Sequence, residues 1–471
     1  MKHFTKFIFI VLFLQGLTSQ SYAQLSPKLN TLLQDKLESM QKSYGFKGLS
    51  VAVTIDNANP WVSAVGISSE NEPLNPNMLI GVGSNTKTFV SATILKMVER
   101  DELSLDDTIG KWISTYANIP TSIKIRQLLN HTSGLNYYLT STFWEDASED
   151  LTKIWTIDEI LTNYVGEPVF AAGSKFDYCN TNYLVLGLLI EKLSGEPCYK
   201  IIRKEIIDPL QLKSTFYPPY ETVDKPYAHF WSDLSGNGYL DDIGNYSDND
   251  ILPNAINSIP NSAGAIVSTA SDNIKFWRSL FEGRIISNQT LNNEMLNFIP
   301  ISSGRSVGYG LGIFKDNYLG NTVFSHGGTW LGQINSNLVD TSRKVYITVL
   351  SNQDSLKNNY TELVVLQLYK ILLDNWQYAE IPAIDYSQRT DVYPNPSSGY
   401  FTVDLPEGVF KSPNIQVYDM LGNEVMNSSF DEMMDAQISI NLSGQNEGIY
   451  LLKISSPQTD SLVFKKVVLT H

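Results

Sequence analysis

The stretch Gly81-Val82-Gly83-Ser84-Asn85-Thr86-Lys87 leads directly into a run from Thr88 to Glu102 whose apolar residues recur at helical spacing. Glycines before a serine, with a helix after it, place Ser84 at a helix N-terminus, where its backbone N–H is an unpaired, positively polarised donor. Lys87 lies three residues further on, on the same face one turn away. The stretch therefore predicts a nucleophile beside a base, provided that burial removes the proton of the lysine.

Spacing alone is weak evidence for this pair, because Ser-x-x-Lys occurs again as Ser39-Met40-Gln41-Lys42. That second copy falls inside an amphipathic helix that we expect to begin after Ser26-Pro27 and to reach Tyr44. There the serine and the lysine are expected to face solvent. The rest of the chain must decide whether Ser84 has a chemical role.

Composition narrows the class of protein. The 471 residues are 42% hydrophobic and 18% charged, as in an ordinary globular protein with room for two or three domains. The formal net charge of −15 argues against nucleic acid or an anionic membrane surface as a partner. Residues 1–23 predict a secretory signal peptide, with a basic start, an apolar core at Phe7–Leu14 and a small-x-small ending at Ser21-Tyr22-Ala23. No later segment predicts a transmembrane helix.

Residues 24–376 are expected to form one domain with strands near both of its ends and mainly helices and loops from about 103 to 260. The expected strands are Leu49–Ile55, Trp61–Ile67, Gly310–Phe314, Thr322–His326, Ile334–Val339 and Lys344–Leu350, and a last helix is expected at Thr361–Asn375. This order predicts an α/β (α+β) fold. One antiparallel sheet, assembled from distant segments, is flanked by helices and carries an inserted, mainly helical lobe.

The end of the chain has a different pattern. Residues 377–391 form a polar linker, and residues 392–471 alternate short strands, such as Phe401-Thr402-Val403 and Ile415–Tyr418, with turn residues. This pattern predicts a separate, small all-β sandwich.

Four motifs occur in order along the 24–376 segment. They are Ser84-Asn85-Thr86-Lys87, the segment Gln127–Leu135 around His131-Thr132-Ser133-Gly134, Tyr178-Cys179-Asn180, and His326-Gly327-Gly328. Together they resemble the serine β-lactamase and penicillin-binding protein superfamily, in the branch of class C β-lactamases, D-alanyl-D-alanine carboxypeptidases and related esterases. The resemblance covers roughly residues 25–375 and implies a β-lactamase/transpeptidase-like fold.

The resemblance implies a role for each matched position. Ser84 would attack a carbonyl and form an acyl-enzyme, with Lys87 as proton acceptor, kept poised by burial and by Asn180. Tyr178 would pass the proton to the leaving group and later activate water; which of Lys87 and Tyr178 is the base stays open. The backbone N–H groups of Ser84 and Thr329 would hold the oxyanion.

The motif His326-Gly327-Gly328 departs from the Lys-Thr-Gly of many relatives. Gly327 lacks the hydroxyl that helps to hold a substrate carboxylate. We therefore expect an esterase or a peptidase that depends less on that carboxylate. A packing role for His326 beside the site is the alternative.

Three other features are weaker candidates. His131 is expected to order a loop. Asp233 to Gly244 begins like a calcium loop but lacks the closing Glu, which favours a polar turn. Cys179 and Cys198 are expected to remain free thiols, because the helix between them would span about 20 Å. We expect no metal and no cofactor.

The tail resembles the C-terminal sorting domain of proteins exported by the type IX secretion system. The match is carried by Pro394-Asn395-Pro396, Val417-Tyr418-Asp419, Gly448-Ile449-Tyr450 and Phe464–Val468. The alternative is a carbohydrate-binding or adhesive sandwich. With the signal peptide, the resemblance implies passage through the periplasm to the cell surface or the medium, with the secretion machinery as partner of residues 392–471.

The sequence therefore predicts an exported serine hydrolase that acts on a small peptide or ester, including cell-wall peptides. Two alternatives remain: a catalytically silent module of the same fold that recognises peptidoglycan stem peptides, and a genuine β-lactamase. The presence of all four residues Ser84, Lys87, Tyr178 and Asn180 speaks against the silent module.

Overall fold

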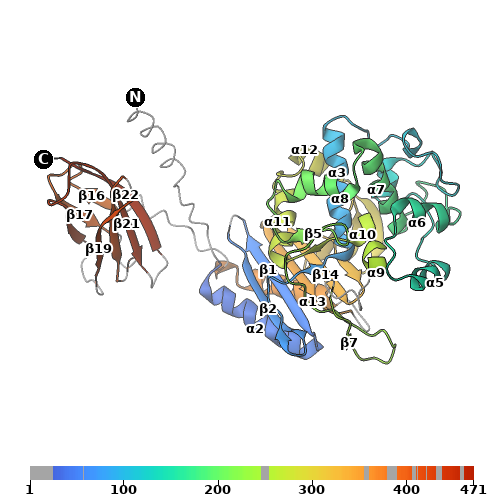
Figure 1. The fold of residues 1–471 in the computed structure, drawn as a ribbon, viewed down its shortest axis with the longest axis horizontal. Helices are drawn as coiled ribbons and strands as arrows, with labels where there is room; N and C mark the ends of the chain where they lie inside the picture. The colour runs from blue at the N-terminus through green and yellow to red at the C-terminus, as the bar shows by residue number, and fades with distance from the viewer. Residues whose placement is uncertain are drawn as a thin grey trace. The chain divides into compact units, whose positions relative to one another are not determined.

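The computed structural model describes residues 25–470, apart from 57, 246–253, 355–359, 379–389, 406–409, 411, 421, 431–436 and 457–460. The predicted signal peptide and most of the predicted linker lie outside the described residues. The chain divides into two compact units, Gln24–Ile381 and a second unit that contains Pro382–His471. Figure 1 shows both units.

The first unit is built on an antiparallel sheet. In the described residues its ten strands follow the order β3-β2-β1-β15-β14-β12-β11-β10-β9, with β13 paired to β14 beside this path. The strands are β1 (Gly48–Ile55), β2 (Trp61–Ser69), β3 (Glu72–Pro73), β9 (Ile299–Ser303), β10 (Ser306–Tyr309), β11 (Phe314–Tyr318), β12 (Asn321–Ser325), β13 (Gly328–Trp330), β14 (Gln333–Asp340) and β15 (Val345–Ser351).

The centre of the sheet joins the two ends of the domain. In the pairing of β1 with β15, Val51 lies opposite Val349 although almost 300 residues separate them. Successive side chains of a strand face opposite sides of the sheet. In β1, Val51 packs with helices α2 (Pro27–Tyr44) and α13 (Tyr360–Asp374), whereas Ala52 belongs to the core on the other face. Helix α11 (Ala270–Phe281) packs on that second face.

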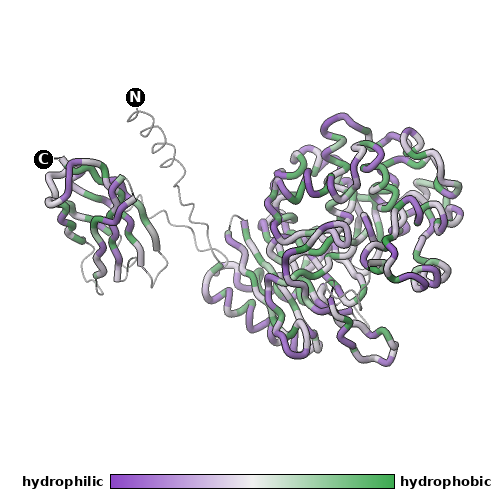
Figure 2. The backbone as a smooth tube through the Cα atoms, in the orientation of Figure 1, coloured by the Kyte–Doolittle hydropathy of each residue, from purple (hydrophilic) through white to green (hydrophobic). Residues whose placement is uncertain are grey.

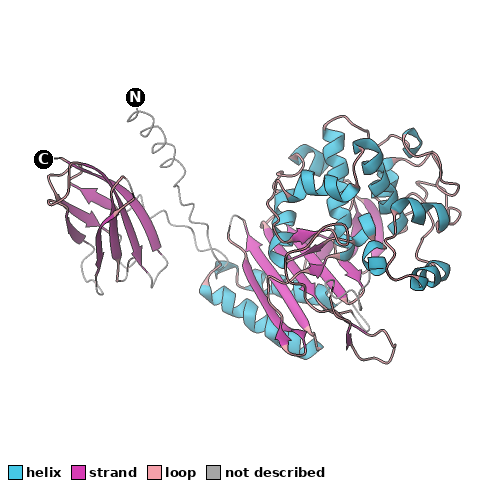
Figure 3. Ribbon diagram, in the orientation of Figure 1, coloured by secondary structure: helices cyan, strands magenta, loops and turns pink. Residues whose placement is uncertain are grey.

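The segment between the two groups of strands forms the helical lobe that the sequence predicts. Figure 3 shows these helices gathered at one side of the sheet. The α-helices of this segment and the short one after α11 are α3 (Thr86–Glu99), α4 (Ile125–Leu129), α5 (Ser141–Glu149), α6 (Ile157–Asn163), α7 (Asn180–Ser194), α8 (Cys198–Ile202), α9 (Asn254–Ser258), α10 (Asn261–Gly264) and α12 (Asn288–Thr290). Helices α3, α7 and α10 pack against one another.

Short elements complete this unit. The helical turns are η1 (Gly83–Asn85), η2 (Ile109–Lys111), η3 (Arg203–Ile207), η4 (Leu291–Met295) and η5 (Trp376–Tyr378). The short strands are β4 (Ile80–Gly81), β5 (Thr215–Phe216), β6 (Trp231–Ser232), β7 (Asp241–Asp242) and β8 (Val267–Ser268). Strands β4, β8 and β5 form a small sheet, and β4 leads straight into the segment that carries Ser84.

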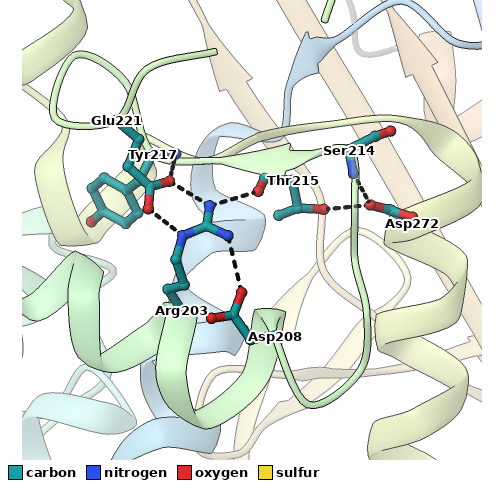
Figure 4. Close-up of polar contacts among 7 residues, drawn as sticks. All are labelled: Arg203, Asp208, Ser214, Thr215, Tyr217, Glu221 and Asp272. Atoms are coloured by element: carbon teal, nitrogen blue, oxygen red, sulfur yellow. Dashed lines mark hydrogen bonds and ion pairs between the residues drawn. The ribbon is translucent and has the colours of Figure 1, made fainter. Parts of the chain in front are cut away.

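A polar network anchors this small sheet (Figure 4). Arg203 extends from η3 and donates to the carboxylates of Glu221 at 2.7 Å and Asp208 at 3.2 Å, and to the backbone oxygen of Thr215 at 3.1 Å. The hydroxyl of Thr215 also lies 3.2 Å from the carboxylate of Asp272 on α11. Because Thr215 belongs to β5, these bonds tie the small sheet to both η3 and α11.

The second unit is a two-sheet sandwich. One sheet contains β16 (Asp391–Tyr393), β17 (Tyr400–Asp404) and β20 (Gln437–Asn441), and the other contains β18 (Asn414–Tyr418), β19 (Glu424–Ser429), β21 (Gly448–Ser456) and β22 (Ser461–Leu469). Figure 2 shows hydrophilic and hydrophobic residues alternating along these strands. The buried members, including Val403 and Ile440 of one sheet and Val417 and Leu452 of the other, form a common core.

The predicted fold class is confirmed in both units, and the sequence prediction fails at one strand. Residues Gly310–Phe314 were expected to be a strand, but Gly310–Ile313 form the turn between β10 and β11, and Phe314 is the first residue of β11. The N–H of Gly310 donates to the carbonyl of Ile313 at 2.8 Å, and Gly312 has a φ of +80°. The run Leu311 to Ile313 is apolar because the turn is buried, not because it is extended.

Candidate active site

Ser84 lies in η1, one turn before α3, as the sequence predicts. Gly83 has a φ of +46°, a conformation that favours glycine, and a Cβ there would lie 2.8 Å from the backbone nitrogen of Thr329. The chain thus turns sharply before Ser84 and passes close to β13. The Ser84 side chain is partly exposed, whereas the following residues Asn85 and Thr86 are fully buried. A partly exposed hydroxyl at the start of a buried helix can be reached by a substrate.

The ε-amine of Lys87 lies 2.9 Å from the Ser84 hydroxyl and 2.7 Å from the backbone oxygen of Ala263 in α10. Its side chain is fully buried. Burial lowers the pKa of Lys87 from 10.5 to about 7, while Cys179 has a smaller, opposing effect. A large fraction of Lys87 is therefore neutral at physiological pH and can accept a proton. The other copy differs, because Ser39 and Lys42 are both exposed on α2.

Tyr178 lies beside Lys87. Its ring centroid is 5.1 Å from the amine of Lys87, and its hydroxyl is near enough to the Ser84 side chain for that side chain to oppose the rise in the pKa of Tyr178. Burial raises the pKa of Tyr178 well above its usual value near 10. The phenol is therefore protonated at neutral pH.

Asn180 begins α7 and has a different partner from the one expected. Its Nδ2 donates to the hydroxyl of Tyr137 at 2.7 Å, and its buried Oδ1 has no hydrogen-bond partner within the described part of the chain. The second partner of the Lys87 amine is the carbonyl of Ala263, not Asn180. Among the described residues, Asn180 thus has an unpartnered acceptor at the start of α7.

Strand β13 packs against η1, the segment that carries Ser84. A Cβ on Gly328 would lie 2.5 Å from the backbone nitrogen of Ser84 and 2.1 Å from the carbonyl of Val82, so only glycine allows this approach. The next residue, Thr329, has its nitrogen beside Gly83. The backbone nitrogens of Ser84 and Thr329 are thereby brought close together, as the two donors of an oxyanion hole must be.

His326 follows β12 and is almost fully buried. Its Nδ1 lies 2.6 Å from the carbonyl of Gly327, and its Nε2 lies 3.3 Å from the hydroxyl of Tyr309. Burial, with a further contribution from Lys87, lowers its pKa from 6.5 to about 3. His326 is therefore neutral at physiological pH and supplies no positive charge to the site.

The comparisons with known proteins agree with this geometry. The model of the family described as Beta-lactamase matches residues 33–368. The chain belongs to the beta-lactamase family. A second model, described as Secretion system C-terminal sorting domain, matches residues 391–470. The sequence-based recognition of both parts is confirmed.

Relatives of this beta-lactamase family member include a penicillin-binding protein and a D-aminopeptidase. This chain is 23% identical over 365 residues to penicillin-binding protein 4* of Bacillus subtilis, and the match covers 74% of this chain and 78% of that protein. It is 23% identical over 303 residues to the D-aminopeptidase of Brucella anthropi, covering 64% of this chain and 55% of that protein.

Solved structures extend the likeness. The D-stereospecific amidohydrolase from Streptomyces sp. has a TM-score of 0.60 and 29% identity, covering 69% of this chain and 94% of that one. The D-amino acid amidase from Ochrobactrum anthropi SV3, complexed with D-phenylalanine, has a TM-score of 0.63 and 24% identity, covering 74% of this chain and 99% of that one. The second likeness establishes the fold alone.

A buried asparagine of this family member supports the site, and sequence reasoning did not single it out. The Asn335 amide on β14 donates to the carbonyls of Val82 at 2.6 Å and Gly328 at 3.2 Å. The Gly328 carbonyl shares a peptide plane with the Thr329 N–H, so Asn335 orients that donor. The signal available in the sequence was the run of three polar residues, Asn335-Ser336-Asn337, inside the expected strand Ile334–Val339.

The structure also describes the Asp233 loop and the two cysteines, which were weaker candidates in the sequence. The Asp233 carboxylate accepts from the backbone N–H groups of Asn237 at 2.9 Å and Gly238 at 2.8 Å, so the loop uses it as a turn. Among the described residues there is no group of three or more His, Cys, Asp or Glu side chains able to hold a metal ion. Cys179 and Cys198 are buried free thiols. No helix in the described ranges has the length and apolar character needed to cross a bilayer.

Proposed function

We propose that this protein is an exported serine hydrolase that cleaves a peptide, amide or ester through an acyl-enzyme on Ser84. The observation that carries the proposal is the buried Lys87 amine, 2.9 Å from the Ser84 hydroxyl, with a pKa lowered to about 7. A serine hydroxyl is a weak nucleophile without an adjacent base, and a buried, partly neutral lysine is such a base.

The acylation step follows from the positions of the groups. The Ser84 oxygen forms a bond to the substrate carbonyl carbon, its proton moves to the Lys87 amine, and the carbonyl electron pair moves to the oxygen. That oxyanion is held by the N–H groups of Ser84 and Thr329, an interaction worth about 3–4 kcal/mol per donor in other enzymes. The intermediate then expels an amine or alcohol, which takes up the proton, and water repeats the sequence on the acyl-enzyme.

Lys87 is the better candidate for the base. The pKa of Tyr178 is raised well above its usual range, so forming its phenolate at neutral pH is unfavourable. As a neutral phenol beside Ser84, Tyr178 can pass a proton to the leaving group. The Ala263 carbonyl accepts one hydrogen of the Lys87 amine, which leaves the nitrogen lone pair available to the hydroxyl of Ser84.

We propose substrates that carry no carboxylate next to the scissile bond, and among them amides and esters of D-amino acids. Gly327 offers no hydroxyl, and the pKa of His326 near 3 leaves that side chain uncharged. A carboxylate would therefore lack the charge-assisted bond that is worth about 1.5–3 kcal/mol elsewhere. Relatives named D-aminopeptidase and D-stereospecific amidohydrolase support the D configuration.

A Gly327→Thr variant is an unsuitable test of carboxylate recognition in this structure. A Cβ on Gly327 would lie 2.7 Å from the backbone oxygen of Asn335, so a threonine would push β13 away from β14. The sharper test compares kcat/KM of the wild type for a D-Ala-D-Ala peptide and for its C-terminal amide. A strong preference for the free acid would make a D-alanyl-D-alanine carboxypeptidase the better assignment.

The domain limits and the route of export belong to the same proposal. We propose a signal peptide at 1–23, the hydrolase domain at 24–376, a linker at 377–391 and the sorting domain at 392–471. The signal peptide would direct the chain to the periplasm, and the sorting domain would carry it through the type IX machinery to the cell surface or the medium. The match of residues 391–470 to the sorting-domain family supports this route.

The decisive experiment is labelling of the purified protein with an active-site-directed fluorophosphonate. We expect one label, on Ser84, with Ser84→Ala unlabelled and Ser39→Ala labelled as the wild type is. Ser39 is the matched control, because it has the same spacing to a lysine but lies exposed on α2. Equal labelling of the Ser84→Ala variant would refute the proposal. A labelled protein inactive on D-aminoacyl amides and esters but active on a chromogenic cephalosporin would be a β-lactamase.

A further inference from the structure

We infer that His131 is a positioning residue for Tyr178, which it holds in place through the backbone on both sides of that tyrosine. The inference rests on the proposed function, in which Tyr178 transfers a proton beside Ser84. His131 has no described hydrogen bond to Ser84 or Lys87, so its effect on the reaction must pass through another residue.

The contacts of His131 lie on either side of Tyr178. Its carbonyl oxygen accepts from the backbone N–H of Asp177 at 2.9 Å, and its Nδ1 accepts from the backbone N–H of Cys179 at 3.1 Å. These are the residues immediately before and after Tyr178. One residue thus anchors the backbone just before and just after Tyr178, which restricts where the Tyr178 side chain leaves the backbone.

The ring of His131 supports the ring of Tyr178 as well. The two ring centroids are 4.2 Å apart and the planes are inclined by 34°. The rings of Tyr309 and Tyr183, at 5.1 Å and 5.3 Å, pack around the imidazole too. His131 is fully buried, so this packing cannot be replaced by solvent.

The hydrogen bonds define the state of the imidazole. A backbone N–H can only donate, so Nδ1 of His131 carries no proton, and the Asn182 amide, 3.0 Å away, must be a second donor to it. The single proton of the neutral ring is then on Nε2, which has no hydrogen-bond partner among the described residues. Neither nitrogen is therefore placed to take a proton from Ser84, which excludes His131 as the base.

The backbone conformation of His131 is also unusual. Its φ is +57°, a conformation that is uncommon for residues other than glycine and tolerated best by Asn, Asp and His. This conformation directs the carbonyl and the imidazole of the same residue to two nearly adjacent N–H groups. A residue that only filled space could be replaced by any apolar side chain on a relaxed backbone.

The test uses two amide substitutions. In His131→Asn the side-chain oxygen can reach the position of Nδ1 and accept from Cys179, and asparagine tolerates the positive φ. In His131→Gln the amide lies one bond further out, so its polarity and volume are kept but the acceptor is displaced. Both are made in the wild type and in a Tyr178→Phe background, and acylation of Ser84 is followed by the fluorophosphonate labelling rate and by kcat and KM for an ester.

We expect Tyr178→Phe to lower the rate about a hundredfold, as loss of a proton-transfer group does. His131→Gln should lower kcat about tenfold or more with little change in KM, because displacing a reacting group by about 1 Å can cost this much. His131→Asn should stay within about threefold of the wild type in the same assay. In the Tyr178→Phe background, His131→Gln should change the rate less than about twofold.

The failures of the two proposals are distinguishable. A Ser84→Ala variant that still turns over the ester overturns the proposed function and this inference with it. An inactive Ser84→Ala variant, together with an equal loss from His131→Gln in both backgrounds, overturns the positioning role alone. If His131→Gln fails to fold, His131→Asn decides: full activity supports the role of the Nδ1 acceptor, and a tenfold loss in a folded protein overturns it.

Discussion

Replacing Lys87 by methionine should inactivate the protein and stabilise it in a pH-dependent way. The pKa of Lys87 falls from 10.5 to about 7 on folding, so between these values the unfolded chain binds a proton that the folded chain does not. The free energy of unfolding of the wild type must then rise with pH across this window. Methionine cannot titrate, and the variant lacks this dependence.

The size of the effect follows from the two pKa values. Relative to a side chain that does not titrate, Lys87 destabilises the fold by about 5 kcal/mol at pH 6 and by about 2 kcal/mol at pH 9. The difference in unfolding free energy between the variant and the wild type should therefore shrink by about 3 kcal/mol from pH 6 to pH 9. Lost hydrogen bonds and changed packing do not depend on pH, so they cancel from this comparison. The nearby His131 and His326 have pKa values below the window and stay neutral throughout it.

The measurement is urea unfolding at pH 6 and pH 9, followed by tryptophan fluorescence. All eight tryptophans lie between Trp61 and Trp376, so the signal reports the hydrolase domain and not the sorting domain. Lys42→Met removes the exposed lysine of the other Ser-x-x-Lys copy and serves as the matched control. A difference between Lys87→Met and the wild type that is the same at both pH values would mean that Lys87 keeps its ordinary pKa. It could not then be the base.

Three further outcomes are expected. The rate of Ser84 acylation, measured by stopped-flow labelling, should rise with pH to a plateau with a midpoint near 7, the pKa of Lys87. A midpoint near 10 would contradict the assignment of Lys87 as the base. Gly328→Ala should lower kcat about a hundredfold or more, because its Cβ would lie 2.5 Å from the Ser84 nitrogen and displace an oxyanion donor; wild-type kcat in this variant would refute the placement of the oxyanion hole. Deleting residues 392–471 should leave the activity of the purified protein intact but should retain the truncated protein in the periplasm. Cell fractionation and immunoblotting would locate it, and truncated protein in the medium would contradict the sorting role.

The sequence predicted the parts of the site that are local. Ser84 and Lys87 lie one helical turn apart, so helical periodicity was enough to bring them together, and the position of Ser84 at the helix start followed from the glycines before it. The strands β1 and β15 were predicted because their apolar, β-branched runs match buried strands of an antiparallel sheet. The turn at Gly310–Ile313 was misassigned as a strand for the same reason, since a buried turn is apolar as well.

The rest of the site depends on pairings that no local pattern encodes. The Lys87 amine finds its second partner in Ala263, 176 residues away. Asn335 contacts Val82 across 253 residues. Spacing in the sequence carries no information about such contacts, which arise only when distant elements pack together, α10 on α3 for Ala263 and β14 beside the Ser84 segment for Asn335.

Burial explains why the chemistry follows from these distant contacts and not from the motif. The Ser39–Lys42 copy has the same spacing as the Ser84–Lys87 copy, but its residues lie exposed on α2, where water solvates the charged amine. The amine of Lys87 is enclosed by α3, α7 and α10, and desolvation alone is the largest cause of its lowered pKa. Any change that lets water reach Lys87 without touching Ser84 should therefore restore its charge and remove its capacity to act as a base.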